Sequence, residues 1–148
     1  MAGPDSIRNI ARQRATELKL PYTGAVFPQE AHALMEAGAT LVDVRTRAEL
    51  EWVGRVPGAL TVEWSAWPGG HPNPDFVAQL AAQAAKDVPV MFLCRSGGRS
   101  HSAASAAARA GYNEVYNVLQ GFEGDKDPSG HRNTLGGWRL AGLPWVQG

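Results

Sequence analysis

The sequence predicts an α/β fold with a mainly parallel central sheet flanked by helices. Short runs of apolar and β-branched residues alternate along the chain with segments of helical periodicity, which is typical of parallel sheets with helical crossovers. The run at 40–44 is β-branched and mostly apolar, as expected of a buried parallel strand, and a second apolar run covers 88–93. In such folds the functional site lies at the carboxyl ends of the strands.

The first helix is expected over residues 6–19, because apolar side chains recur there at helical spacing. Asp5 or Ser6 is a suitable N-cap, and Pro21 ends the segment. We interpret residues 1–21 as an N-terminal helical extension. Its arginines allow two interpretations: a helix packed on the domain with solvated basic side chains, which is the commoner arrangement, or a basic docking surface for a partner.

The next segments alternate between strand and helix. Residues 22–27 are expected to form a short strand, and Pro28 then suits the first turn of a helix. That helix covers 30–37 and stops at Gly38, a residue type that often ends helices. The β-branched strand at 40–44 follows.

A third helix is predicted to start after Thr46, because Thr46 and Glu49 have the spacing of a capping box. Residues 54–58 have the glycine and proline content of a turn, and a strand is expected at 59–62. Residues 64–74 are rich in tryptophan, proline and glycine and are expected to be irregular.

The second half continues the alternation. It comprises an amphipathic helix at 75–86, the strand at 88–93, an alanine-rich helix at 101–110, a last strand at 114–119, a polar, glycine-rich surface excursion at 120–137 and a final short helix at 138–142. No internal repeat is visible, and 148 residues suit one core, so we interpret residues 22–148 as a single domain. Trp64 and Trp67 either line the entrance of a site or pack within the core and loop.

Composition excludes several classes of protein. Hydrophobic residues make up 44% of the chain and charged residues 19%, which is ordinary for a soluble globular protein. The formal net charge is zero, so we expect no nucleic-acid partner. The chain shows neither the apolar core of a secretory signal nor a run of about 18 apolar residues, so we expect a cytoplasmic protein without a membrane span.

Cysteine and histidine usage restrict the cofactor chemistry. A single cysteine can form no internal disulfide and no CxxC site, and it suits a reducing compartment. No metal is expected, because metal-ligand spacing is lacking among the four histidines, His32, His71, His101 and His131. No organic cofactor is expected either, since the chain has no dinucleotide-binding glycine motif and no Walker loop.

The stretch around Cys94 carries the chemistry that the sequence predicts. An ordinary thiol has a pKa of about 8.5 and attacks as the thiolate, so a reactive cysteine needs groups that stabilise the anion. Arg95 and Arg99 bring permanent positive charge, and Gly97 and Gly98 permit successive N–H groups to turn toward one point. The following helix adds its positive end.

A lone cysteine after a strand is more often a small core residue than a nucleophile. A structural turn, however, needs no pair of arginines around Gly-Gly, so we interpret Cys94 as reactive. The candidate site consists of Cys94 as the catalytic residue and, as substrate-binding residues, Arg95, Ser96, Gly97, Gly98, Arg99 and Ser100.

Several motifs, in the expected order, resemble those of the rhodanese-like sulfurtransferases. The heptapeptide Cys-Arg-Ser-Gly-Gly-Arg-Ser at 94–100 is similar to their active-site loop. Residues 41–45 followed by Glu49 resemble their Asp-Val-Arg…Glu segment, and 54–59 resembles their Gly-His-Ile-Pro-Gly-Ala turn. The end of the chain, 136–144, resembles their closing Gly-Gly…Trp…Ala-Gly-Leu-Pro element. Two departures are Arg55 in place of the histidine of the turn and the long excursion before the closing element.

The resemblance implies a three-layer rhodanese-like fold and a single-domain thiosulfate sulfurtransferase. Cys94 would take the outer sulfur of a small anionic donor such as thiosulfate, become a persulfide and pass the sulfur to cyanide or a thiol. Asp43, Arg45 and Glu49 would support the loop through ion pairs or hydrogen bonds. Two loop arginines favour the doubly charged thiosulfate over 3-mercaptopyruvate, for which the family's loops tend to be less basic.

Three alternatives stay open at this point. Cysteine phosphatases and arsenate reductases place an arginine at the sixth position after the cysteine, where this chain has Ser100. A rhodanese-like module that binds a protein partner with little turnover commonly lacks the cysteine, which this chain keeps. A persulfide carrier would hand its sulfur to a protein acceptor, and the basic N-terminal helix would serve that role.

Overall fold

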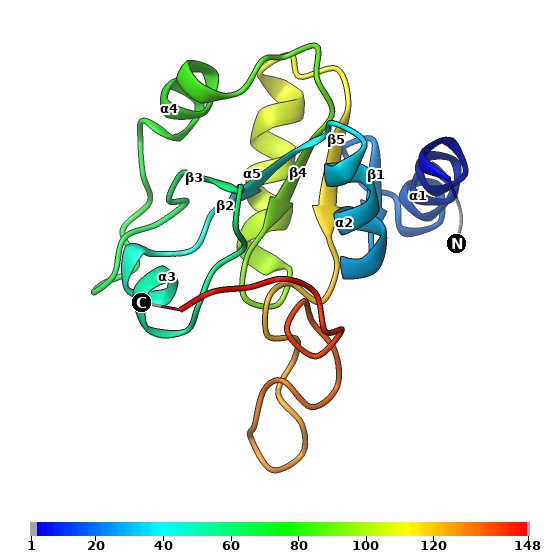
Figure 1. Cartoon of the computed structure of the whole chain (residues 1–148). Helices are drawn as coiled ribbons and strands as arrows, with labels where there is room; N and C mark the ends of the chain where they lie inside the picture. The colour runs from blue at the N-terminus through cyan, green and yellow to red at the C-terminus, as the bar shows by residue number, and fades with distance from the viewer. Residues whose placement is uncertain (1–2, 148) are drawn as a thin grey trace.

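The computed structural model describes residues 3–147. Within this range five strands form one sheet, in which every strand pairing is parallel. In spatial order they are β1 (Gly24–Val26), β5 (Val115–Val118), β4 (Val90–Leu93), β2 (Thr40–Asp43) and β3 (Leu60–Thr61). The strand that precedes the cysteine loop, β4, is therefore central (Figure 1). The expected α/β class with a mainly parallel sheet is confirmed.

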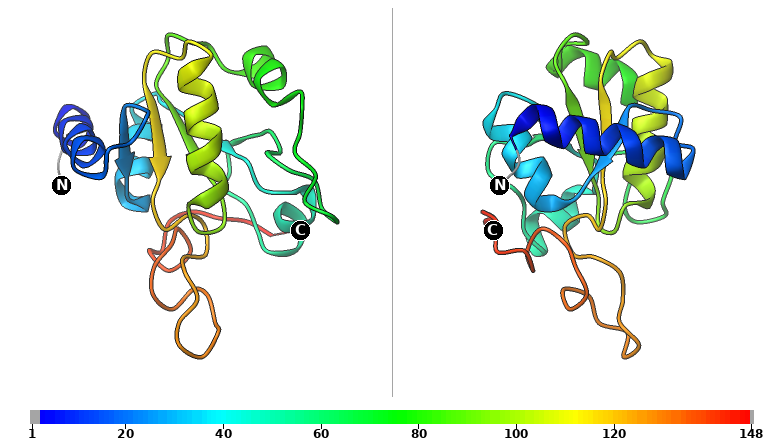
Figure 2. Two further views of the ribbon diagram at one scale, coloured as in Figure 1. Left: turned by 180° about the vertical axis from the view of Figure 1, so that it is seen from behind. Right: turned by 90° about the vertical axis from the view of Figure 1, so that its right-hand side faces the viewer.

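Helices cover both faces of this sheet and create three layers (Figure 2). The helices are α1 (Pro4–Leu18) and α2 (Pro28–Glu36) on one face, α4 (Phe76–Gln83) and α5 (Gly98–Arg109) on the other, and α3 (Arg47–Trp52) after the carboxyl end of β2. Side chains alternate along β4, so that Phe92 packs among residues of α4 and α5 while Leu93 packs among residues of α1 and α2. Two hydrophobic core clusters result, one on each face.

The N-terminal helix α1 is packed against the domain. Gly24 of β1 lies so close to it that a Cβ at this position would be 2.7 Å from the backbone of Ala11. The helical stripe expected from the sequence buries Ile7, Ala11 and Ala15. The expected N-cap is wrong: the cap is Gly3 and not Asp5 or Ser6, because Pro4 already suits the first helical position.

The arginines of α1 connect it to the rest of the domain. Arg8 donates to Glu114 at 2.6 Å, and Arg12 lies 3.8 Å from the same carboxylate. Arg14 forms a two-point contact with Glu30 of α2. Of the two interpretations of these basic side chains, this packing favours a helix attached to the domain over an open docking surface.

The capping box at the start of α3 is confirmed. The Glu49 backbone N–H donates to the Thr46 hydroxyl at 3.3 Å, and the Glu49 carboxylate accepts from the Thr46 backbone N–H at 3.2 Å. Because the cap positions Glu49 in the first turn, its side chain stays near the carboxyl edge of the sheet, where the cysteine loop lies.

Three helices differ clearly from the expectation. The helix after the cysteine loop begins at Gly98, three residues earlier than expected, directly after Gly97 turns the chain with a φ of 120°. The helix expected at 75–86 is shorter, since α4 ends at Gln83. The short helix expected at 138–142 is a turn, closed by local hydrogen bonds from the Ala141 N–H to the Gly137 carbonyl and from the Gly142 N–H to the Arg139 carbonyl.

The segment 120–137 projects beyond the carboxyl edge of the sheet (Figure 1). Asp127 organises it: one carboxylate oxygen accepts from the backbone N–H groups of Ser129 and His131, both at 2.9 Å. The other oxygen accepts from the hydroxyl of Thr134 at 2.8 Å. Across the described residues, none of the helices has both the length and the apolar character needed to cross a membrane.

Candidate active site

Cys94 lies at the carboxyl end of β4, where the chain turns into α5. Its side chain is buried, with 1% of the residue exposed. The Gly97 backbone N–H donates to the Cys94 sulfur at 3.1 Å, and the Ser100 hydroxyl lies 3.2 Å from the same sulfur. The turn at Gly97, where φ is 120°, therefore directs the Gly97 N–H toward the thiol and places the Ser100 hydroxyl of α5 beside it.

The start of the 120–137 segment is attached to the cysteine loop by backbone hydrogen bonds. Phe122 donates its N–H to the Cys94 carbonyl at 2.8 Å, and Glu123 donates to the Arg95 carbonyl at 3.0 Å. Gly121 allows this approach, because a Cβ there would lie 2.5 Å from the Cys94 carbonyl oxygen. Sequence reasoning missed this contact, for which the only local signal is a glycine just after β5.

A polar residue of β5 faces the thiol from the neighbouring strand. The Ser100 hydroxyl donates to the side-chain carbonyl of Asn117 at 2.5 Å, and both residues are buried. Asn117 pairs in register with Phe92, which places it on the same face of the sheet as Cys94. Sequence reasoning missed Asn117 as well, although an asparagine within an apolar strand was a signal.

Arg99 and Glu49 form a two-point ion pair at the rim of the loop. The Arg99 guanidinium donates to the two carboxylate oxygens of Glu49 at 2.7 and 2.9 Å. Burial opposes the negative charge of Glu49, but Arg99 and the Thr46 cap outweigh it and lower the pKa of Glu49 to about 2. The same contact raises the pKa of Arg99, which also experiences the charge of Cys94.

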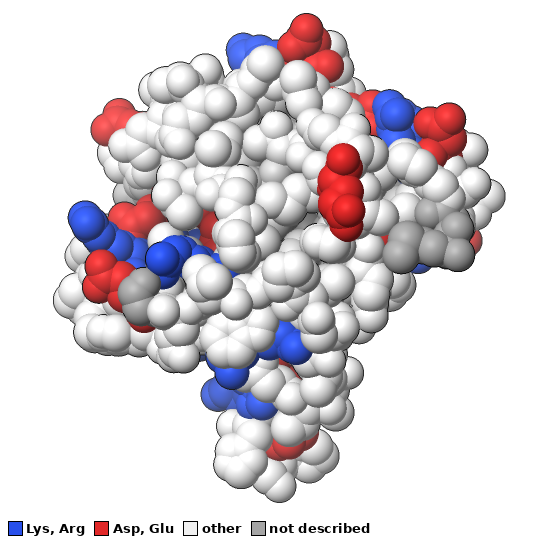
Figure 3. Space-filling view, in the orientation of Figure 1, with Lys and Arg blue, Asp and Glu red and all other residues white. Residues whose placement is uncertain are grey.

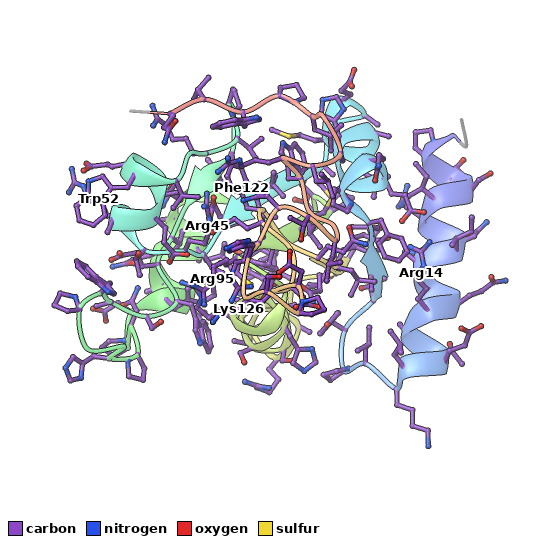
Figure 4. The ribbon with its side chains drawn as sticks, turned by 90° about the horizontal axis from the view of Figure 1, so that it is seen from below. Arg14, Arg45, Trp52, Arg95, Phe122 and Lys126 are labelled. Atoms are coloured by element: carbon purple, nitrogen blue, oxygen red, sulfur yellow. The ribbon has the colours of Figure 1, made fainter. Side chains whose placement is uncertain are left out.

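Arg95 differs from Arg99, because it forms no ion pair with any residue between 3 and 147. Its side chain is exposed. In Figure 4, which looks onto this end of the molecule, the labelled Arg95, Arg45, Phe122 and Lys126 project onto the middle, and Trp52 lies to one side. The face seen in Figure 3 is largely uncharged and carries small groups of acidic and basic side chains.

Asp43 and Arg45 form a buried ion pair with an N–O distance of 2.7 Å. Arg45 also donates to the Gly54 carbonyl, and its guanidinium lies 4.2 Å from the centre of the Phe122 ring. Glu49 thus contacts a side chain of the candidate loop directly, whereas Arg45 contacts Phe122, whose N–H donates to the Cys94 carbonyl.

A pocket of about 400 Å³ opens beside the loop. Arg95, Arg99 and Glu49 line one part of it, and the exposed rings of Trp52 and Trp67, whose centroids are 5.8 Å apart, line another. Trp64 packs instead against Phe76 in the core. Trp67 therefore lines the pocket beside the loop, whereas Trp64 does not.

The site therefore offers thiol chemistry in a cationic, hydrogen-bonding surrounding. Cys94 is buried at the end of a strand, in contact with N–H and O–H groups, and Arg95 is available for an anion. In the part of the chain that the structure describes, no group of three or more histidine, cysteine or carboxylate side chains is placed to hold a metal ion.

Comparison with known proteins agrees with this geometry. The rhodanese-like domain family matches residues 27–127. The chain is 36% identical over 111 residues to the uncharacterized protein RC0915 of Rickettsia conorii, a match that covers 72% of this chain and 82% of that protein. It is 34% identical over 96 residues to the thiosulfate sulfurtransferase GlpE of Stutzerimonas stutzeri, covering 65% of this chain and 78% of that one.

A solved structure is similar along most of the molecule. The crystal structure of Rv0390 from M. tuberculosis superposes with a TM-score of 0.79 and 43% sequence identity, over 86% of this chain and 99% of that one. Both the sequence motifs and the three-layer parallel fold therefore lead to the same assignment: the chain belongs to the rhodanese-like domain family.

Proposed function

We propose that the protein is a sulfurtransferase that carries sulfane sulfur as a persulfide on Cys94. The observation that carries the proposal is the position of the Cys94 sulfur, which accepts a hydrogen bond from the Gly97 N–H at the positive end of α5. Relatives named thiosulfate sulfurtransferase support the reaction class.

In the first step the Cys94 thiolate attacks the outer sulfur of thiosulfate. A sulfur–sulfur bond to Cys94 forms, the bond to the sulfonate sulfur breaks, and sulfite leaves with the bonding electron pair. In the second step cyanide or a thiolate attacks the outer persulfide sulfur, and the Cys94 thiolate is released. Covalent catalysis of this kind gives ping-pong kinetics.

The two loop arginines have different tasks in this scheme. Arg95 is exposed and without an ion pair among the described residues, so it is the cation that binds the sulfonate of thiosulfate and stabilises departing sulfite. Arg99, already paired with Glu49, holds the shape of the loop and lends the sulfur a more distant positive charge. Ser96, Gly97, Gly98 and Ser100 complete the cradle.

Asp43, Arg45 and Glu49 act as loop support rather than as reacting groups. Glu49 holds Arg99, and the Asp43–Arg45 pair holds the ring of Phe122, whose N–H donates to the Cys94 carbonyl. This division follows from their contacts, since only the Glu49 carboxylate contacts a side chain of the loop.

The kinetic test is thiocyanate formation from thiosulfate and cyanide. We expect ping-pong kinetics, no turnover by Cys94→Ser, and a preference for thiosulfate over 3-mercaptopyruvate. Loss of Arg95 in Arg95→Gln should raise the KM for thiosulfate about tenfold, as removing a charge-assisted hydrogen bond of roughly 1.5 kcal/mol does. Arg109→Gln, at the opposite end of α5, is the matched control.

Equal KM values for the Arg95 and Arg109 variants would contradict the assignment of Arg95 to the donor. Persistent turnover by the Cys94 variant would contradict the persulfide mechanism as a whole. Failure of every donor to be turned over would favour the partner-binding module.

A further inference from the structure

A short series of hydrogen bonds leads from the buried thiol to the neighbouring strand. From Cys94 it passes to Ser100 at 3.2 Å and from Ser100 to Asn117 of β5 at 2.5 Å. Both Ser100 and Asn117 are buried. Tyr22 lies close to Asn117, and its hydroxyl is 2.8 Å from Nδ1 of the exposed His101.

The donors and acceptors of this series determine what Ser100 can offer to sulfur. A hydroxyl carries one hydrogen, and an amide carbonyl oxygen can only accept. Because the Ser100 hydrogen is donated to the Asn117 carbonyl, the Ser100 oxygen presents lone pairs to Cys94. That arrangement suits a protonated thiol, which donates its own hydrogen to Ser100, better than a thiolate, which needs a donor.

The orientation of the Asn117 amide is held from its other end. Its NH₂ group donates to the Gly97 carbonyl at 3.3 Å, while its carbonyl accepts from Ser100. Burial raises the pKa of Tyr22 to about 12, so Tyr22 keeps its hydrogen and can donate it to His101. An amide with both ends engaged cannot turn its carbonyl away from Ser100 without losing these contacts.

We propose that Asn117 is a positioning residue of the site: by taking the Ser100 hydrogen it withholds that hydrogen from the Cys94 sulfur and restrains formation of the thiolate in the resting protein. Two opposing influences then act on one sulfur. The Gly97 N–H and Arg99 favour the anion, and the Asn117–Ser100 pair favours the thiol. The proposal rests on the proposed function only in taking Cys94 as the reacting sulfur.

The charged and titratable groups around this sulfur come from several elements. They are Arg95 and Arg99 of the loop, Glu49 of α3, the Asp43–Arg45 pair at the end of β2, Tyr22 before β1 and His101 of α5. The test leaves all of them in place, because the variants change only Ser100 and Asn117, which carry no charge.

The experiment is the pH dependence of Cys94 alkylation by iodoacetamide in the wild type, Asn117→Leu, Ser100→Ala and the double variant. Leucine has nearly the shape of asparagine and removes the acceptor. We expect Asn117→Leu to react about three- to tenfold faster on the acid side of the profile, the effect of one hydrogen bond. Because Ser100 transmits the effect, the same substitution should change nothing in the Ser100→Ala background.

Slower or unchanged alkylation of Asn117→Leu, or an equal increase in both backgrounds, would overturn the proposal. If Asn117→Leu does not fold, Asn117→Ala, which also lacks the acceptor for the Ser100 hydrogen, replaces it, and we expect an increase of the same sign. No increase there would also count against the proposal. Alkylation requires no sulfur transfer, so its outcome is separate from that of the thiosulfate assay.

Discussion

The position of Gly121 requires a glycine, because the backbone is left-handed there and no space is left for a side chain. It has a φ of 63°, in the left-handed region, and its α-carbon faces the Cys94 carbonyl so closely that a Cβ would lie 2.5 Å from that oxygen. The sulfur therefore sits where it does partly because a residue far along the chain has no side chain.

The Gly121→Ala substitution should consequently lower the free energy of unfolding by more than about 3 kcal/mol, since backbone strain and a clash with main-chain atoms act together. Gly130→Ala is the matched control: Gly130 has a φ of 82°, but a Cβ there would meet nothing within 4 Å. Strain alone should cost the control about 1 to 2 kcal/mol. Denaturant unfolding of both variants measures the difference, and equal losses would show that the close approach does not matter.

The sequence made Cys94 and its loop the candidate site, because charge, glycine content and position after a strand are local properties. It gave no indication of the contacts of Gly121 and Asn117 with this loop, because these contacts depend on which strand lies beside β4. Strand order is set by the packing of the whole sheet. A single asparagine or glycine in the sequence does not indicate which residue of an adjacent strand it contacts.

At the scale of secondary-structure elements, α3 acts as the brace of the loop. Its capping box orients Glu49, and Glu49 holds Arg99. Because the pKa of Glu49 is lowered from 4.5 to about 2 in the folded chain, the unfolded chain binds the proton more readily between these values. The contribution of the Glu49–Arg99 pair to the free energy of unfolding is therefore complete above pH 4.5 and is lost as the pH falls toward 2.

The difference in free energy of unfolding between wild type and Glu49→Gln should therefore shrink as the pH is lowered through this range. Chemical denaturation at a series of pH values between about 6 and 2 measures it. Glu17→Gln, at an exposed position of α1, controls for the loss of a surface carboxylate. A constant difference at every pH would mean that the Glu49–Arg99 pair adds nothing to stability.

The helix α1 offers a second prediction at this scale. Ile7 is 2% exposed and belongs to the core cluster, whereas Ile10, on the same helix, is 39% exposed. Ile7→Ala should cost about 2 to 4 kcal/mol of stability and Ile10→Ala less than about 1 kcal/mol. Similar small losses at both positions, measured by thermal unfolding, would mean that α1 is an appendage and not part of the folded unit.

Elements with strong periodicity or a capping box were predictable, as α1 and α3 show, because their stabilising contacts lie within a few residues. The expected helix at 138–142 was wrong for the opposite reason. Its start is attached to residues 121 and 122 by backbone hydrogen bonds, and its Trp138 is fully buried in the core cluster on the α1 and α2 face. Helix propensity contains no information about such contacts with distant residues.

For the whole molecule, the fold brings three distant segments to one end of the sheet. The loop after β4 supplies the thiol, α3 supplies the brace, and the segment after β5 supports the loop from behind. The all-parallel arrangement makes this convergence possible, because the carboxyl ends of all strands face the same edge. The alternation of strands and helices in the sequence was sufficient to predict that edge, but not the contacts across it.

If Cys94 carries sulfur, the intact mass of the protein before thiosulfate, after thiosulfate and after subsequent cyanide reveals it. We predict a gain of the mass of one sulfur atom with thiosulfate, complete loss of that gain with cyanide, and no gain in Cys94→Ser. A wild-type protein whose mass does not change, or a Cys94→Ser variant that gains the same mass, would contradict the account.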